Sequence, residues 1–151
     1  MGKQSVVITN KPFQETIDYL EPHCRVVANT EVEVWGEAET MAHLRDAVAM
    51  MAFMPDNVDE RFLDRCPNLK LISCALKGYD NFDLDACSRR GVLVTIVPDL
   101  LTNATAELAV GLTIGLARNV RAGDTYIRSG KFNGWRAHLY GKGLNGSVVG
   151  L

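Results

Sequence analysis

Short runs of β-branched and other apolar residues alternate with helical patterns along the first hundred residues, and this alternation restricts the fold more than any other feature. The runs predict strands at 5–9, 25–28, 48–53, 69–75 and 93–97. The segments between them predict helices at 12–20, 37–46, 59–66 and 83–90. Strands that alternate with helices form parallel sheets with right-handed crossovers. The sequence therefore predicts an α/β fold with a flavodoxin-like, doubly wound parallel sheet.

The third and fourth predicted strands are almost continuously apolar. Such strands are typical of parallel sheets that helices cover on both faces. Polar residues that favour helix N-termini precede two of the predicted helices, Asn10 before the first and Asp83 before the fourth. Both residue types accept a hydrogen bond from a free backbone N–H of the first turn.

The pattern changes after Pro98. A long helix is predicted at 102–120, capped by Thr102 or Asn103, and a second helix runs to about residue 129. A glycine-rich arm with aromatic and basic residues follows, and residues 147–151 begin as a strand. We expect one domain at 1–101. Residues 102–151 would then form an interdomain helix, an arm and the first strand of a second, incomplete domain.

Composition excludes several partners. Sixteen basic and eighteen acidic side chains give a net charge of −2, so no basic face for nucleic acid or an anionic membrane is expected. The four cysteines have no CxxC spacing, which favours reduced, mostly buried thiols and a cytoplasmic protein without a signal peptide. The acidic cluster at 80–85 is interpreted as a turn and helix start, so no metal site is predicted.

Two segments leave the carboxyl ends of predicted strands, where open parallel sheets bind ligands. They are residues 54–56 and 77–80. Lys77 beside Gly78 offers an ammonium group and accessible backbone N–H groups, which suit a small anion. The alternative is that Lys77 is an ordinary solvated lysine. For Met54, the alternative to a ligand contact is a packing position in the core or at its rim. None of the three histidines has a carboxylate partner in sequence that favours a general base.

The sequence at 141–146 matches GxGxxG, but it precedes a predicted strand. A dinucleotide fingerprint must follow a strand and open a helix, so this match does not predict such a site. Trp135 and Tyr140 lie in the same arm, where aromatic residues close a site, contact a partner or anchor the arm. Gly111 and Gly115, four apart on the long helix, leave a shallow stripe for a second backbone. Together these features predict a homodimer.

Three segments carry a family resemblance: MMAFMPD at 50–56, ALKGYDNFD at 75–83 and VPDLLT at 97–102. They resemble the phosphonate (phosphite) dehydrogenases, within the wider D-2-hydroxyacid dehydrogenase family. The lysine loop distinguishes phosphite enzymes from most hydroxyacid relatives. The sequence departs from the pattern at Leu139, where an aromatic residue is common, and at 103–104, where an apolar–proline pair is usual.

The resemblance implies oxidation of phosphite to phosphate with reduction of NAD. Lys77 and the backbone at Gly78 would hold the phosphite, with Met54, Trp135 and Tyr140 around it. Lys77, Leu101 and Thr105 would lie beside the cofactor, which a Rossmann domain starting near residue 147 would bind. The family's catalytic arginine, glutamate and histidine belong to the second domain, so no catalytic residue is assigned.

Two alternatives remain from the sequence. One is a D-2-hydroxyacid dehydrogenase that acts on a small carboxylate, and the other is a binding or regulatory relative without turnover. The 151-residue chain by itself is expected to be inactive, because it has no cofactor glycine loop and no base of the family type.

Overall fold

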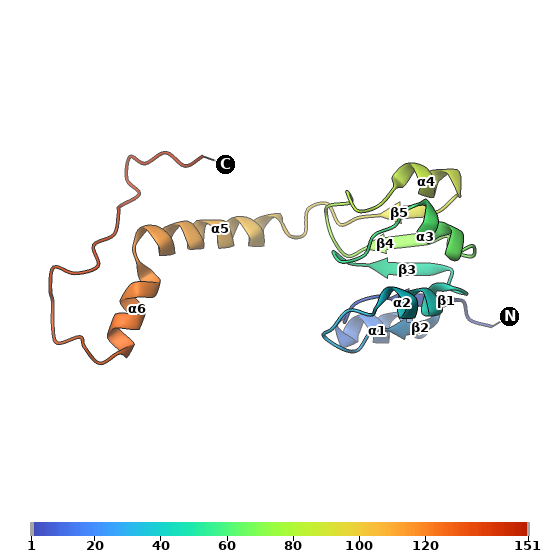
Figure 1. Cartoon of the computed structure of the whole chain (residues 1–151), viewed down its shortest axis with the longest axis horizontal. Helices are drawn as coiled ribbons and strands as arrows, with labels where there is room; N and C mark the ends of the chain where they lie inside the picture. The colour runs from blue at the N-terminus through green and yellow to red at the C-terminus, as the bar shows by residue number, and fades with distance from the viewer. Residues whose placement is uncertain (1, 151) are drawn as a thin grey trace. The chain divides into compact units, whose positions relative to one another are not determined.

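The computed structural model describes residues 2–150 of the chain. Strand and helix alternate in the order β1 (Ser5–Ile8), α1 (Gln14–Leu20), β2 (Arg25–Ala28), α2 (Glu37–Leu44), β3 (Ala49–Ala52), α3 (Glu60–Arg65), β4 (Leu71–Cys74), α4 (Leu84–Arg89) and β5 (Leu93–Thr95). Two helices follow, α5 (Thr102–Ala117) and α6 (Val120–Arg128) (Figure 1).

The five strands form one parallel sheet in the order β2-β1-β3-β4-β5, which confirms the predicted flavodoxin-like α/β fold. The register aligns one residue of each strand in a row across the sheet: Val27, Val7, Met50, Ile72 and Val94. The three central members of this row are at most 1% exposed. This row of residues is therefore the part of the sheet that contributes most to the hydrophobic core.

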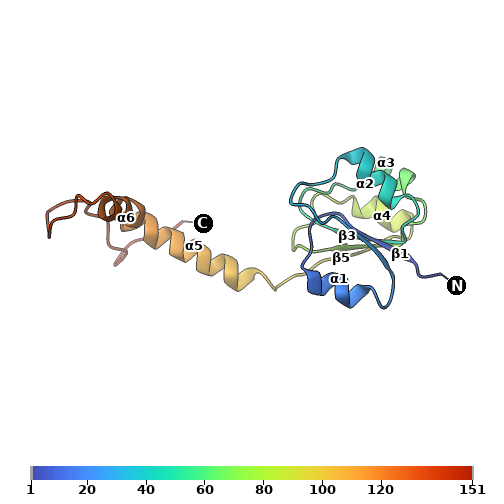
Figure 2. The ribbon, with the colours of Figure 1, turned by 90° about the horizontal axis from the view of Figure 1, so that it is seen from below.

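Helices α2, α3 and α4 cover one face of the sheet, and α1 lies on the other face (Figure 2). Side chains on the three-helix side are buried in β3 and β4, whereas the alternate residues Ala49, Met51 and Leu71 are half-buried. Among residues 2–99, helices therefore lie on both faces of the sheet, as the doubly wound fold predicts, but the second face of β3 and β4 is only partly covered. The apolar sequence of a strand does not show how completely helices cover its second face.

Aspartate side chains cap two of the helices, one of them as the sequence predicts. Asp83 accepts a hydrogen bond from the Ala86 N–H at 2.8 Å, as predicted, and Asp59 accepts one from Phe62 at 2.8 Å. Asn10 does not cap α1, because the chain stays non-helical until Phe13. The predicted caps of α5 are also wrong, since Leu101 occupies that position without a side-chain hydrogen bond.

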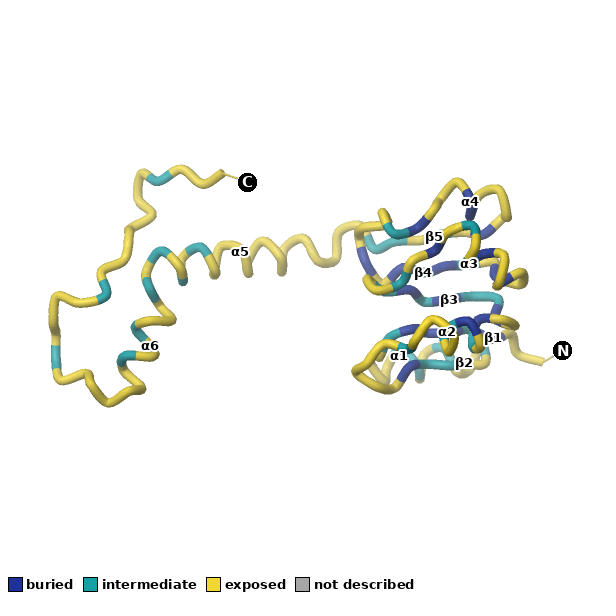
Figure 3. Tube along the Cα trace, in the orientation of Figure 1, coloured by how far each residue is buried: buried dark blue, intermediate teal, exposed yellow. Residues whose placement is uncertain are grey.

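The chain divides into two compact units, one ending at Asp99 and the other starting at Leu100. None of the described residues of the second unit is buried, in contrast to the sheet of the first (Figure 3). Helix α5 ends before the predicted residue 120, because Asn119 adopts a left-handed conformation with φ of 54°. Asparagine tolerates this conformation, and it separates α5 from α6.

Residues 147–150 form no strand, contrary to the prediction, and Leu151 lies outside the described residues. A strand needs a neighbour for its backbone hydrogen bonds. No strand is described in the second unit with which this segment could pair.

The thiols follow the sequence-based expectation. Cys66, Cys74 and Cys87 are buried, Cys24 is half-buried, and all four are free. Burial raises the pKa of the three buried thiols, which keeps them protonated. Within residues 2–150, no helix is long and apolar enough to cross a bilayer.

Candidate functional site

The carboxyl ends of β3 and β4 bring two of the predicted segments to one edge of the sheet. The strands are neighbours, and their last hydrogen bond joins the Ala75 N–H to the Ala52 carbonyl oxygen at 2.9 Å. Met54 follows β3 and is 75% exposed. Lys77 and Gly78 follow β4 and are exposed. The structure thus places Met54, Lys77 and Gly78 on adjacent loops at the edge where such sheets bind ligands.

Leu76 anchors the start of the Lys77 loop. Its side chain is buried, and its carbonyl oxygen accepts a hydrogen bond from Val97 at 3.0 Å. Gly78 faces open space, since a Cβ built on it would have no atom within 4 Å. The loop is therefore fixed at its base, and it leaves room for a ligand to approach its backbone.

Asp56 is a functional candidate that sequence reasoning passed over. Its Oδ2 atom accepts hydrogen bonds from the Thr9 hydroxyl at 2.5 Å and from the Phe53 N–H at 2.7 Å. Burial raises the pKa of the Asp56 carboxyl, and these two hydrogen bonds oppose that rise. The signal in the sequence was the position of Asp56 in the segment 54–56, which leaves the carboxyl end of a predicted strand.

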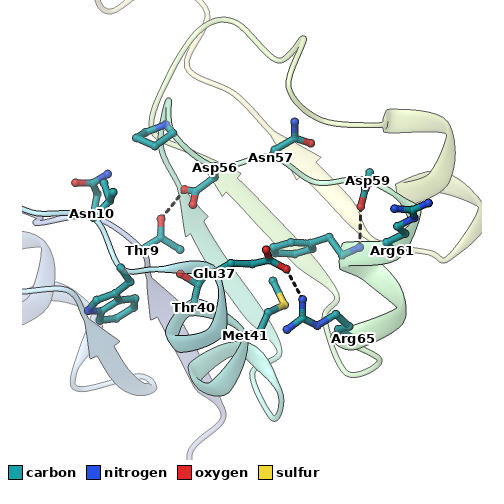
Figure 4. Close-up of a pocket in the computed structure, with 14 residues that line it drawn as sticks. Thr9, Asn10, Glu37, Thr40, Met41, Asp56, Asn57, Asp59, Arg61 and Arg65 are labelled. Carbon is teal, nitrogen blue, oxygen red and sulfur yellow. Dashed lines mark hydrogen bonds and ion pairs between the residues drawn. The ribbon is translucent and has the colours of Figure 1, made fainter.

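A pocket of about 610 Å³ opens beside Asp56, at the carboxyl ends of β1 and β3 (Figure 4). The strand order reverses between these two strands, and such switch points are the usual ligand sites of doubly wound sheets. Its charged lining residues are Glu37, Asp56, Asp59, Arg61 and Arg65. Arg65 forms an ion pair with Glu37 at 2.5 Å. Met54, Lys77 and Gly78 do not line this pocket.

The predicted cofactor residues Leu101 and Thr105 belong to the second unit. They lie one turn apart at the start of α5, where the Thr105 N–H donates to the Leu101 carbonyl oxygen at 3.0 Å. Leu101 is 49% exposed and Thr105 is also exposed. An apolar side chain and a hydroxyl group on one helical face suit a ring that carries an amide. Residues 141–146 neither follow a strand nor open a helix.

The arm, residues 130–146 after α6, is hydrogen-bonded to the junction between α5 and α6. The Asn119 side chain donates to the Tyr140 carbonyl oxygen at 3.0 Å, and the Lys142 N–H donates to the Ala117 carbonyl oxygen at 2.7 Å. The Tyr126 ring contacts the rings of Phe132 and His138.

These contacts order the backbone of the arm while its predicted site residues remain accessible. Trp135 is 76% exposed and Tyr140 is 74% exposed. Sequence reasoning did not identify Asn119 or Tyr126 as the residues that hold the arm. Their roles depend on contacts with residues 5 to 21 positions further along the chain.

Replacement of Gly141 by alanine is expected to release the arm. A Cβ at this position would lie 2.3 Å from the Ala117 carbonyl oxygen and 2.7 Å from the Arg118 Cα, and both are backbone atoms. The hydrogen bond from Lys142 must then break. We expect faster tryptic cleavage after Arg136 and Lys142, measured by mass spectrometry of the native chain. Gly143→Ala is the control, because a Cβ there meets nothing within 4 Å. Equal cleavage rates in the two variants would contradict this role of Gly141.

No group of three or more histidine, cysteine, aspartate or glutamate side chains suited to a metal ion occurs among residues 2–150. The exposed Lys77 side chain and the accessible backbone at Gly78 are groups of the kind that suits a small anion.

The chain is similar in sequence and in structure to known proteins of one family. The profile of the D-isomer specific 2-hydroxyacid dehydrogenase catalytic domain matches residues 6–142. A glyoxylate reductase of Thermococcus litoralis is 33% identical over 132 residues, which are 80% of this chain and 40% of that protein. The TT0316 protein of Thermus thermophilus superposes with a TM-score of 0.85 at 32% identity, over 92% of this chain and 45% of that one.

A D-lactate dehydrogenase of Aquifex aeolicus, solved with NAD and lactic acid, shares the fold with a TM-score of 0.73 at 21% identity. That likeness covers 94% of this chain and 42% of the other. The chain spans less than half the length of the relatives that it matches. The match over residues 6–142 shows that the chain belongs to the D-isomer specific 2-hydroxyacid dehydrogenase family, as part of its catalytic domain.

Proposed function

We propose that this chain is the substrate-binding part of an NAD-dependent oxidoreductase that oxidises phosphite to phosphate. The observation that carries the proposal is the Lys77–Gly78 loop, which presents a cationic side chain and an accessible backbone at the carboxyl end of β4. A compact ammonium group and backbone N–H groups suit a small tetrahedral dianion. The motifs around this loop resemble those of phosphite dehydrogenases.

Met54, on the neighbouring loop, supports the proposal as an apolar wall that limits the hydration of the bound anion. A positive group acts more strongly on a substrate when bulk water is excluded. Trp135 and Tyr140 supply exposed aromatic surface that would close the site, either in the same protomer or in a partner. Their exposure in the arm is the observation that motivates this role.

The cofactor assigned by this proposal is NAD, which accepts a hydride when bound. Leu101 and Thr105 fit the nicotinamide end of that cofactor, because they place an apolar side chain and a hydroxyl group on one accessible helical face. Lys77 would orient the phosphite toward the nicotinamide. The described residues contain no strand–glycine loop–helix element of the kind that binds a pyrophosphate.

The proposed reaction balances as phosphite plus water and NAD⁺ giving phosphate, NADH and a proton. The P–H bond breaks, and its hydrogen leaves with both bonding electrons as the hydride that appears in NADH. A P–O bond forms to the attacking water. Lys77 holds negative charge on the substrate oxygens through this change. It does not remove the proton from water, and the acid–base groups of the resemblance lie in the second domain.

Reduction of a small 2-oxo acid is the second candidate function. Its support is the name glyoxylate reductase, carried by relatives that are 33% and 32% identical to this chain. A carboxylate needs one cationic contact and backbone donors, which the same Lys77 loop offers.

The two candidates separate in one experiment on an enzyme in which this chain is completed by a nucleotide-binding domain of the family. NADH formation from phosphite is followed at 340 nm, and phosphate is identified by phosphorus NMR. NADH oxidation is measured in parallel with glyoxylate. We expect kcat/KM to be higher for phosphite. Turnover of glyoxylate without turnover of phosphite would overturn the proposed substrate.

We also propose that the enzyme is a homodimer. Five apolar side chains of α5 are between 44% and 83% exposed: Leu108, Val110, Leu112, Ile114 and Leu116. Extended exposed apolar surface marks a contact site, and we assign this one to a second copy of the chain because Gly111 and Gly115 allow close approach along the same helix. Sedimentation of the completed enzyme at micromolar concentration is expected to show a dimer. A fully active monomer would contradict this assignment.

A further inference from the structure

Polar side chains on four strand-end loops form one hydrogen-bonded chain across the carboxyl edge of the sheet. Each lies on the loop after a different strand, and their order in space follows the sheet: Asn29 after β2, Thr9 after β1, Asp56 after β3 and Asn81 after β4. The series thus runs from the second strand to the loop that carries Lys77.

Three hydrogen bonds link these four residues. The Asn29 side chain donates to the Thr9 carbonyl oxygen at 3.4 Å. The Thr9 hydroxyl donates to Asp56 Oδ2 at 2.5 Å, and Figure 4 shows this second bond. The Asn81 side chain donates to the Asp56 carbonyl oxygen. Asn29 and Thr9 are at most 3% exposed. Buried polar groups that lose a partner are costly, so each of these bonds stabilises the loop from which its donor or acceptor comes.

The last of these bonds fixes the far end of the Lys77 loop. The Asn81 backbone contributes as well, because its carbonyl oxygen accepts from the Val58 N–H at 3.0 Å. Leu76 fixes the near end through Val97. Residues 77–80, which lie between the two anchors, are all exposed. Four exposed residues between fixed ends have few conformations, so the anchors determine where Lys77 is presented.

We infer that Asp56 and Asn81 are positioning residues, which hold the Lys77–Gly78 loop at a fixed place relative to the Met54 loop. The inference rests on the proposed function, since it assumes that Lys77 binds the substrate anion. The Asn81 side chain donates to the Asp56 carbonyl oxygen, and Asp56 Oδ2 accepts from Thr9 and from the Phe53 N–H. Thr9 supports them at a distance from the loop, through the Asp56 carboxylate.

A purely structural role and a positioning role predict different kinetics. Loss of fold lowers all activity together. Displacement of the loop by a fraction of an ångström lowers the use of the anion and leaves cofactor binding intact. Misplacement by about 1 Å can cost about a hundredfold in rate, so a loop with one anchor removed is expected to lose about tenfold or more.

The test uses the completed enzyme with phosphite as the probe. Asn81→Ala removes the anchor, and Thr9→Val removes the hydroxyl while keeping the side-chain shape. We expect each to lower kcat/KM for phosphite about tenfold or more, with KM for NAD within about twofold of the unmodified enzyme. Thr9→Ser keeps the hydroxyl and should restore most of the loss. Gln14→Ala, which removes a remote amide bonded to Asp18, is the matched control and should change neither value.

Thermal unfolding of each variant accompanies the kinetics. Wild-type phosphite kinetics in a folded Asn81→Ala enzyme would overturn the inference. So would equal losses in phosphite and NAD parameters, or a Thr9→Ser enzyme as impaired as Thr9→Val. Failure of the proposed function is distinct, because it appears as an unmodified enzyme that does not oxidise phosphite. The same variants are then measured with glyoxylate, for which the same ratios test the positioning role.

Discussion

Replacing Lys77 by alanine in the completed enzyme is expected to lower kcat/KM for phosphite by one to two orders of magnitude, with little change in KM for NAD. A hydrogen bond to a charged group contributes about 1.5–3 kcal/mol, and about 1.4 kcal/mol corresponds to a factor of ten. Lys77→Arg should recover part of the loss. It keeps the charge, but its planar guanidinium group reaches the anion differently.

Lys70→Ala is the matched control for this prediction. Lys70 is also exposed, but it directly precedes β4 and so lies at the opposite end of the same strand. Gly78→Ala adds a second probe, since its Cβ meets no protein atom within 4 Å and fills only the space open to a ligand. Unchanged phosphite kinetics in Lys77→Ala would reduce Lys77 to a solvated loop residue.

Truncation of Ile72 to alanine is expected to produce the largest loss of stability. Ile72 is 0% exposed and lies in the row of core residues between Met50 and Val94. Removal of a buried isoleucine side chain to alanine costs about 2–5 kcal/mol, because it loses apolar burial and leaves a cavity. Whole domains are stable by about 5–15 kcal/mol, so this change removes a large part of the free energy of unfolding.

Urea unfolding of the chain, followed by circular dichroism, measures this loss. Leu93→Ala is the control: Leu93 lies on the neighbouring strand β5 and is 63% exposed. Its truncation should cost less than about 1 kcal/mol, as for other surface changes. Similar losses for the two variants would mean that the row through Ile72 is not the centre of the core.

The elements of the fold were largely predictable because strand and helix patterns repeat over short distances. All five strands occur where the apolar runs predicted them, although four are shorter than the runs. Asp83 caps α4 through a residue three positions away, which a local pattern can predict. Asn119 ends α5 early through its own backbone conformation, which periodicity does not encode.

The candidate site was predictable only where the chain itself marks a strand end. The position of Lys77 and Gly78 after β4 follows from the apolar run before them. The partners of Asp56 do not, since Thr9 lies 47 residues before it and Asn81 lies 25 residues after it. The predicted flavodoxin-like fold says which strands are neighbours, but the sequence pattern does not say which loop side chains form hydrogen bonds across them.

The sequence by itself determined the α/β class, the positions of the five strands and the loop that presents Lys77, because apolar periodicity and turn residues act locally. Only the tertiary structure decided which side chains meet at the switch point between β1 and β3, where Thr9 lies against Asp56 and a pocket opens. It also decided that, within residues 2–99, α2, α3 and α4 lie on one face of the sheet and α1 lies on the other. These features arise from packing and hydrogen bonding between segments that are distant in the sequence. Such contacts form only when the chain folds.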